Sequence, residues 1–250
     1  MLYLIGLGLW DEKDLTVRGV ETAKKCERVY LEAYTDKLGG LSKVKLEKML
    51  GKQIVELDRA DIEETPFFIP EAIGWDIALL VGGDPLVATT HSDLLLRCKE
   101  KGVECQVIHN ASIYSAIAET GLQMYKFGKT ATVVFWEDNF RPSSFYEAVK
   151  ENSSRGLHTL LLLDIKKDKL MSPRHAIKTL IEIDTEFKEK KIVVMSRAGS
   201  KQPGMDYGRA DELLSHKYGL GPHVLIVPGK LHPLEKEMLE SLTPSQKRNP

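Results

Sequence analysis

The chain has 250 residues with a formal net charge of −1, a balance that gives no overall basic field and therefore argues against a nucleic-acid partner. No apolar run approaches the roughly 20 residues of a membrane span, and the amino terminus lacks the basic flank of a signal peptide, so we expect a cytoplasmic protein without a membrane partner. The three cysteines form no CxxC pair and the seven histidines are scattered, so we expect neither a disulfide framework nor a metal site.

The first half of the chain alternates short apolar runs with helical patterns. This alternation is typical of an α/β domain with a mostly parallel sheet and helices on its faces. We expect strands at residues 2–5, 28–31, 54–57, 77–81 and 104–108, and helices at 16–26, 43–49 and 92–101. Thr16 is the expected N-cap of the first helix.

A glycine-rich loop, Gly6–Trp10, follows the first strand. It resembles the start of a dinucleotide-binding fingerprint, but the third glycine of that fingerprint is missing. The acidic residues Asp11, Glu12 and Asp14 come next and would repel a phosphate group. These features argue against a nicotinamide-dependent oxidoreductase.

The fourth expected strand breaks into Gly82-Gly83-Asp84-Pro85 and continues to His91. The carboxyl edge of an open α/β sheet is where ligands bind, and two glycines let the backbone approach one closely. A second polar loop, residues 109–116, follows the next strand and would lie beside residues 82–91 if the two strands were neighbours. The alternative is an ordinary strand-to-helix connection, in which Asp84 accepts backbone N–H bonds and His91 simply begins the next helix.

The second half has strand patterns at residues 131–135, 158–165, 192–196 and 223–228, and a helical pattern at 173–188. Residues 141–145 and 202–206 are typical of surface loops. Residues 121–128 connect the halves, so we expect two α/β domains, residues 1–120 and 121–250. A cleft between two such domains is a usual place for a small-molecule site.

Six motifs, taken together and in order, identify a resemblance to a known family: Gly6–Leu9, Gly82–His91, Ser112–Ala116, Arg155–Leu161, Arg197–Ser200 and Pro228–Glu235. The chain resembles the tetrapyrrole-methylase-like (class III) S-adenosylmethionine-dependent methyltransferases from residue 1 to about residue 240. The Gly-Asp-Pro turn belongs to the whole superfamily. The longer motifs around it, and those at residues 157–161 and 229–233, are closest to members of the diphthamide pathway.

The resemblance implies two α/β domains with S-adenosyl-L-methionine bound in the cleft between them, and S-adenosyl-L-homocysteine as the product. It implies that the first domain contacts the cofactor through Leu9, Asp84 and Val87, and that Ser112 and Ile113 cradle its methionine part. From the second domain it implies contacts by Leu163, Tyr207 and His232 at the adenosine end. Of these, Tyr207 lies beside the expected loop at 202–206, and His232 has the alternative of packing against the last strand.

The resemblance also implies a substrate and a partner. The substrate would be translation elongation factor 2, on which one histidine carries a 3-amino-3-carboxypropyl group whose amine is methylated. The archaeal type of this enzyme makes the trimethylammonium product, diphthine, and family members are usually homodimers. The residues leave the proton acceptor open among Asp11, Asp164, Glu137 and His91. They also leave open a corrin or porphyrin methyltransferase, and a regulatory protein that binds the cofactor without turnover.

Overall fold

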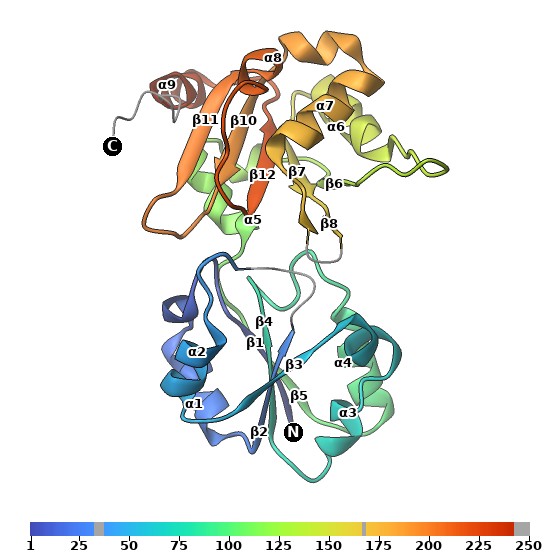
Figure 1. Ribbon diagram of the computed structural model, residues 1–250, viewed down its shortest axis with the longest axis vertical. Coiled ribbons are helices and arrows are strands. Elements are labelled where there is room, and N and C mark those ends of the chain that lie inside the picture. Colours follow the sequence, from blue (N-terminus) through green and yellow to red (C-terminus); the bar gives the residue numbers. More distant parts are fainter. Residues whose placement is uncertain (33–37, 167–168, 243–250) are drawn as a thin grey trace. The chain divides into compact units, whose positions relative to one another are not determined.

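The computed structural model describes residues 1–32, 38–166 and 169–242 and consists of two compact units, Met1–Ala116 and Ile117–Pro250 (Figure 1). The division falls close to the boundary expected after residue 120. Each unit has its own five-stranded sheet, which confirms the α/β class.

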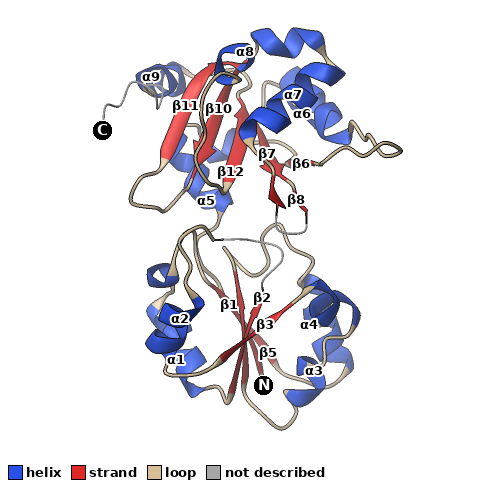
Figure 2. Cartoon of the chain, viewed as in Figure 1, coloured by secondary structure: helices blue, strands red, loops and turns tan. Residues whose placement is uncertain are grey.

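The sheet of the first unit is parallel throughout, with the strand order β3-β2-β4-β1-β5. Helices flank it on both sides (Figure 2). Its strands are β1 (Leu2–Gly6), β2 (Arg28–Glu32), β3 (Ile54–Leu57), β4 (Ile77–Val81) and β5 (Cys105–Ile108). The helices that connect and follow them are α1 (Val17–Lys25), α2 (Lys43–Leu50), α3 (Phe68–Glu71), α4 (Ser92–Glu100) and α5 (Ile113–Ala116). The strands and the three longer helices confirm the expected elements, with each end shifted by at most one residue.

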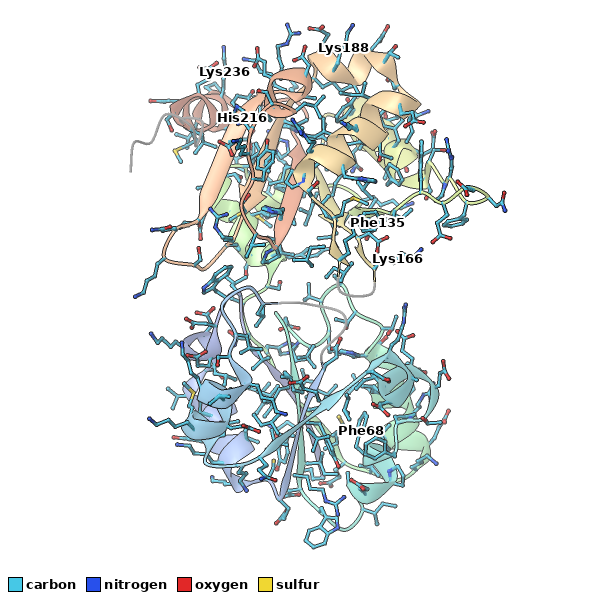
Figure 3. All side chains as sticks on the ribbon, viewed as in Figure 1. Phe68, Phe135, Lys166, Lys188, His216 and Lys236 are labelled. Atoms are coloured by element: carbon cyan, nitrogen blue, oxygen red, sulfur yellow. The ribbon has the colours of Figure 1, made fainter. Side chains whose placement is uncertain are left out.

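The alternation of side chains along β4 explains why helices cover both faces of this sheet. Ile77 and Leu79 pack with α3 and α4, whereas Ala78 and Leu80 pack with α1 and α2. Phe68 of α3 is completely buried in the first of these cores (Figure 3). Full burial of each such large apolar side chain contributes about 1.5–3 kcal/mol. The expected cap is present, since Thr16 Oγ1 accepts a hydrogen bond from the Gly19 N–H at 3.0 Å.

The second unit has a mixed sheet with the order β11-β10-β12-β7-β6, in which only β6 and β7 are parallel neighbours. Its strands are β6 (Ala131–Val133), β7 (Thr159–Leu163), β10 (Lys191–Ser196), β11 (Gly204–Arg209) and β12 (His223–Val227), and β8 (Ile165–Lys166) pairs separately with β9 (Lys169–Leu170). Its helices are α6 (Ser144–Ser154), α7 (Pro173–Ile183), α8 (Ala210–Leu213) and α9 (Pro233–Ser241). Side chains of α6 and α7 form one core with alternate residues of the sheet.

Three expectations for the second half were wrong in detail. The loop expected at residues 202–206 is in part strand β11, which begins at Gly204 and pairs with β10. The loop expected at 141–145 ends in helix α6, because Phe145 is buried in the core. The helix expected at 173–188 stops at Ile183, where the Asp184 carboxylate accepts the Glu186 N–H and starts a 3-10 turn, η5 (Thr185–Glu189).

Candidate functional site

The loops that follow β4 and β5 contact each other at the carboxyl edge of the first sheet. Their strands are not neighbours, because β1 lies between them. The Asn110 N–H nevertheless donates to Asp84 Oδ2 at 3.1 Å, and His109 Nδ1 lies 2.8 Å from the same oxygen. The two loops therefore lie side by side as expected. The expectation had assumed that β4 and β5 are neighbouring strands, and they are not.

Gly6, the last residue of β1, is what allows this contact. A Cβ at position 6 would lie 2.6 Å from Gly83 O and 2.7 Å from Asn110 Cβ, closer than carbon atoms tolerate. The Asn110 side-chain amide instead crosses the end of β1 and donates to Gly6 O at 2.8 Å and to Asp14 O at 3.0 Å. Glycine at the end of β1, which lies between β4 and β5, thus lets the loops of these two neighbouring strands close above it.

A two-bond bridge fixes the glycine-rich loop of β1 against the turn of β4. The Gly8 N–H donates to Gly83 O at 3.1 Å, and the Gly83 N–H donates to Gly8 O at 2.8 Å. Both residues have positive φ, 82° and 65°, which only glycine adopts readily. Asp14 holds the next stretch, since its Oδ2 accepts the Leu9 N–H at 3.2 Å and the Trp10 N–H at 2.7 Å. Leu9, a predicted cofactor contact, is therefore held in place by its backbone.

The Asp84 carboxylate makes its hydrogen bonds within the protein. It is 5% exposed, and its Oδ1 accepts the Leu86 N–H at 3.0 Å while its Oδ2 faces Asn110 and His109. This geometry supports the interpretation of Asp84 as a turn carboxylate. Val87 N–H closes the turn on Asp84 O at 3.2 Å. A direct contact of Asp84 or Val87 with a cofactor stays a prediction.

Ser112 directly precedes helix α5, and Ile113 is the first residue of that helix. Ser112 is buried, and its carbonyl accepts the N–H groups of Ser115 and Ala116, both at 3.0 Å. The Ser115 hydroxyl donates to the same carbonyl at 2.9 Å. Ile113 is half-buried. Both residues lie in the segment that follows β5 and Asn110, so the first unit gathers all five of its predicted contact residues in three connected loops.

His91 supports the turn from within the protein. Its Nδ1 lies 3.0 Å from Pro85 O, its Nε2 lies 3.2 Å from Glu32 Oε2, and its side chain is completely buried at the start of α4. Burial lowers the pKa of His91, but hydrogen bonding and charge from Glu32, together with the Pro85 carbonyl, outweigh it and raise the pKa. These contacts support the structural interpretation, in which His91 begins the next helix.

The three predicted contact residues of the second unit are spread along its sheet. Leu163, which closes β7, lies level with His223 at the start of β12, and His232 follows the other end of β12. Tyr207 lies on β11 opposite Val193 of β10, so it is on the edge strand. The structure therefore does not bring these three residues together.

Leu163 and Tyr207 also face opposite sides of their sheet. Leu163 packs on the core formed with α6 and α7, whereas Tyr207 shares its face with Val193 and Ile226, which lie outside that core. Because the two side chains point to different faces, one ligand could contact both residues only if at least one of them used its backbone. Burial raises the pKa of the half-buried Tyr207 phenol, with a smaller contribution from Glu240.

A buried carboxylate, Glu235, lies at the start of α9 behind His232. Its Oε1 accepts the Gln123 N–H at 2.9 Å and faces His158 Nε2 at 3.0 Å, and its Oε2 accepts the His232 N–H at 2.7 Å and pairs with the Lys126 ammonium. Burial works to raise the pKa of Glu235, but these four donors outweigh it and lower the pKa to about 2.

This pKa predicts how acid affects stability. Glu235 titrates at about 2 in the folded protein, against an ordinary 4.5 in the unfolded chain, so its stabilising contribution is complete above about pH 4.5 and is lost as the pH falls towards 2. We expect Glu235→Gln to remove about 2 kcal/mol of this pH-dependent stability. Urea unfolding at several pH values measures it, with Glu237→Gln on the exposed side of α9 as the control. An equal loss in wild type and Glu235→Gln between pH 5 and about 3 would contradict the assignment.

The four candidate proton acceptors all have structural partners. Asp11 Oδ1 caps a 3-10 turn by accepting the Lys13 N–H, Asp164 Oδ2 accepts the Phe135 N–H, and Glu137 pairs with Lys166. His91 is buried, as described above. The geometry singles out none of them as a general base, so no catalytic residue is assigned.

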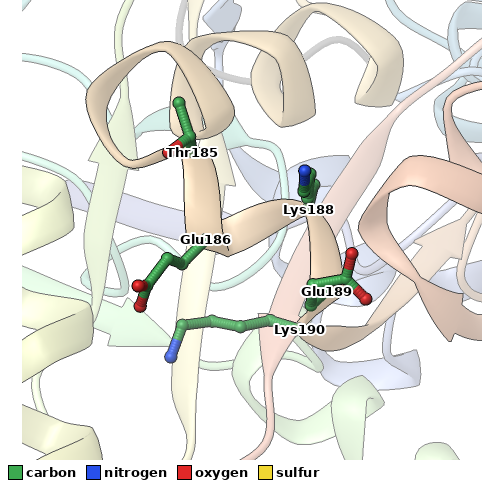
Figure 4. A pocket seen from close by; sticks show the side chains of 5 residues that line it. All are labelled: Thr185, Glu186, Lys188, Glu189 and Lys190. Atoms are coloured by element: carbon green, nitrogen blue, oxygen red, sulfur yellow. The ribbon is translucent and has the colours of Figure 1, made fainter.

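One further hollow of the described surface lies away from the predicted cofactor residues. A hollow on η5 is lined by Thr185, Glu186, Lys188, Glu189 and Lys190 and contains none of the predicted cofactor residues (Figure 4). Among residues 1–32, 38–166 and 169–242, no three His, Cys, Asp or Glu side chains are grouped so that they could hold a metal ion. None of the helices in the described part of the chain is long and apolar enough to cross a membrane.

Sequence reasoning missed the residues that support the predicted contacts: Gly6 as a spacer, Asn110 as a link between loops, and the pair His158 and Glu235. Asn110 carried a signal, since it directly follows a strand in a polar loop. Glu235 also carried one, because it stands three residues after the N-cap of a helix, where a capping-box carboxylate belongs.

Comparisons with known proteins cover almost the whole chain. The family model of the tetrapyrrole (corrin/porphyrin) methylases matches residues 1–213. A diphthine synthase of Methanocaldococcus jannaschii is 46% identical over 97% of this chain and 98% of its own length. One of Methanococcus vannielii is 45% identical over the same shares. A crystal structure of diphthine synthase superimposes with a TM-score of 0.91 at 40% identity, covering 97% of this chain and 95% of the other.

Proposed function

The chain belongs to the tetrapyrrole (corrin/porphyrin) methylase family, and from that membership we propose that it is the methyltransferase of diphthamide biosynthesis that makes diphthine. Its substrate is translation elongation factor 2 bearing a 3-amino-3-carboxypropyl group on one histidine, and it methylates the amine of that group. The match to diphthine synthases over 97% of the chain, rather than to the shared family domain alone, supports this substrate over a corrin or porphyrin. The membership also confirms the resemblance that the sequence motifs indicated.

The methyl donor is S-adenosyl-L-methionine. In the proposal it is contacted by residues of both units: Leu9, Asp84, Val87, Ser112 and Ile113 of the first, and Leu163, Tyr207 and His232 of the second. The single observation that carries this is the joining of three strand-end loops by the Gly8–Gly83 bridge and the Asp84–Asn110 bond. Such a rigid edge offers fixed backbone groups to the amino-acid part of a ligand.

The chemistry needs mainly proximity and alignment. S-adenosyl-L-methionine would supply the methyl group, which the amine nitrogen would take from the donor's sulfur with S-adenosyl-L-homocysteine as the leaving group. The attacking amine must first lose a proton, and with a pKa a few units above 7 a small fraction is neutral at any moment. Holding the two reactants in line then supplies most of the rate, and water serves as the proton acceptor.

The relatives also inform the extent of the reaction. The two diphthine synthases whose organisms are given above come from archaea, so we extend the proposal to the trimethylammonium product of the archaeal type, made with three donor molecules. The proposal includes a homodimer and a place in the cytoplasm, where a translation factor is available. Light scattering of the purified protein tests the dimer.

The test of function is methyl transfer. We expect label from radioactive S-adenosyl-L-methionine to enter elongation factor 2 that carries the unmethylated group, and not a factor whose target histidine is replaced. Binding of the donor without transfer to the intact factor would overturn the substrate. The corrin or porphyrin methyltransferase and the regulatory binding protein would then be the remaining interpretations.

A further inference from the structure

The loop between β12 and α9, residues 228–232, ends in the predicted cofactor contact His232. We name it the Pro228–His232 loop. It is held to the rest of the second unit at four backbone atoms. His158 Nδ1 accepts the Gly229 N–H at 2.9 Å, Gly156 O accepts the Lys230 N–H at 3.1 Å, and Lys126 Nζ donates to Lys230 O at 2.7 Å. Glu235 accepts the His232 N–H at 2.7 Å.

Glu235 joins three of these attachments. Besides the His232 N–H it binds the Lys126 ammonium and His158, the two side chains that hold Gly229 and Lys230. Its side chain is completely buried, as is that of His158. Four donors fill the positions around its two oxygens, so the carboxylate is fully used in holding this part of the chain.

His158 cannot take part in proton transfer to a ligand. Its Nδ1 accepts from Gly229, so in the neutral ring the proton is on Nε2, which donates to Glu235 Oε1 at 3.0 Å. Burial lowers the pKa of His158, and Lys126 lowers it further against the opposite effect of Glu235, which favours that neutral form. Both ring nitrogens are thus occupied inside the protein.

His232 differs from these two residues because it is exposed. Its Nδ1 accepts the Leu234 N–H at 3.4 Å, and its backbone N–H is bound to Glu235. Gly229 makes the loop's close approach possible, since a Cβ there would lie 2.4 Å from Leu157 O. The backbone of the loop is therefore fixed, while the far side of the imidazole is open to a ligand.

We propose that Glu235, together with His158, is a positioning residue for the cofactor: it fixes the Pro228–His232 loop so that His232 is held ready to contact the bound nucleoside. This inference rests on the proposed function, because it takes His232 as a contact of S-adenosyl-L-methionine. It goes beyond that function because it states that Glu235, a buried residue that does not touch the ligand, fixes the position from which His232 contacts it.

A double-mutant cycle tests the proposal by titration calorimetry with S-adenosyl-L-homocysteine. We expect Glu235→Gln to weaken binding about tenfold, the loss that follows from breaking charge-assisted hydrogen bonds. In the His232→Ala background the same substitution should change binding by less than about twofold, because the residue it positions is gone. Glu237→Gln, on the same helix, is the matched control and should bind as wild type does.

A second pair of variants keeps the test valid if Glu235→Gln does not fold. His158→Gln retains one acceptor for Gly229 and one donor for Glu235, so it should bind within about twofold of wild type, whereas His158→Ala should weaken binding.

The outcomes separate the two claims. Wild-type protein that binds no S-adenosyl-L-homocysteine contradicts the proposed function. Wild-type binding together with an equal effect of Glu235→Gln in both backgrounds contradicts the positioning role, because the carboxylate would then act without His232. Full binding by Glu235→Gln, or by His158→Ala, would contradict it as well.

Discussion

We expect Gly6→Ala to abolish cofactor binding and to lower the free energy of unfolding by about 3 kcal/mol. The new Cβ would lie 2.6 Å from Gly83 O and 2.7 Å from Asn110 Cβ, so both neighbouring loops must move away from the end of β1. That movement would break the Gly8–Gly83 bridge and the Asp84–Asn110 bond, which carry the proposed site. Calorimetry with S-adenosyl-L-homocysteine and urea unfolding measure the two effects.

Gly74→Ala is the matched control for this substitution. A Cβ at position 74 meets nothing within 4 Å, and its φ lies outside the left-handed region, so alanine should be tolerated with stability and binding unchanged. A Gly6→Ala protein that binds the cofactor as tightly as wild type would show that closure of the loops over β1 is not needed for the site.

The second large effect is expected for Asp84→Asn, which keeps the shape of the side chain but replaces one acceptor oxygen by a donor. Asp84 Oδ1 faces the Leu86 N–H and Oδ2 faces the Asn110 N–H, so in either orientation the new amide group points at a donor. We expect the free energy of unfolding to fall by about 2 kcal/mol and cofactor binding to weaken at least about tenfold. The same two measurements apply, with the exposed Asp93→Asn on α4 as the control.

The effect of this variant on stability separates the two interpretations of Asp84. If its carboxylate only attracted the positive sulfonium, affinity would fall and stability would not change. If it holds the turn, affinity and stability should both fall, and both losses should persist in about 1 M salt because Asp84 is buried. A loss of affinity without a loss of stability would contradict the turn role.

Much of the first unit could be predicted from the sequence because its strands are short apolar runs separated by helical patterns. The second unit was harder. Strand β11 lies at the edge of its sheet and contains Gly204, Gly208 and Asp206, a composition typical of a loop, and it is a strand because β10 offers it a partner. Pairing with a neighbour, rather than the strand's own residues, decides such a case.

The functional site, too, could be predicted only in part from the sequence. Its loops were visible as glycines and polar residues after strands, but the contact of Asp84 with Asn110 depends on Gly6 in a third strand between them. The partnership of His158 with Glu235 joins residues 77 positions apart, which no local pattern reports. The capping box of α9 was also obscured, because its N-cap is His232 rather than the usual Ser or Thr.

Mass spectrometry of elongation factor 2 after incubation with this protein and S-adenosyl-L-methionine tests the proposed methyl transfer directly. We expect three added methyl groups, all on the amine nitrogen of the 3-amino-3-carboxypropyl group of a single histidine. A target peptide of unchanged mass would contradict the proposed function. Methyl groups found on the carboxylate or on another residue would contradict the proposed chemistry at the amine.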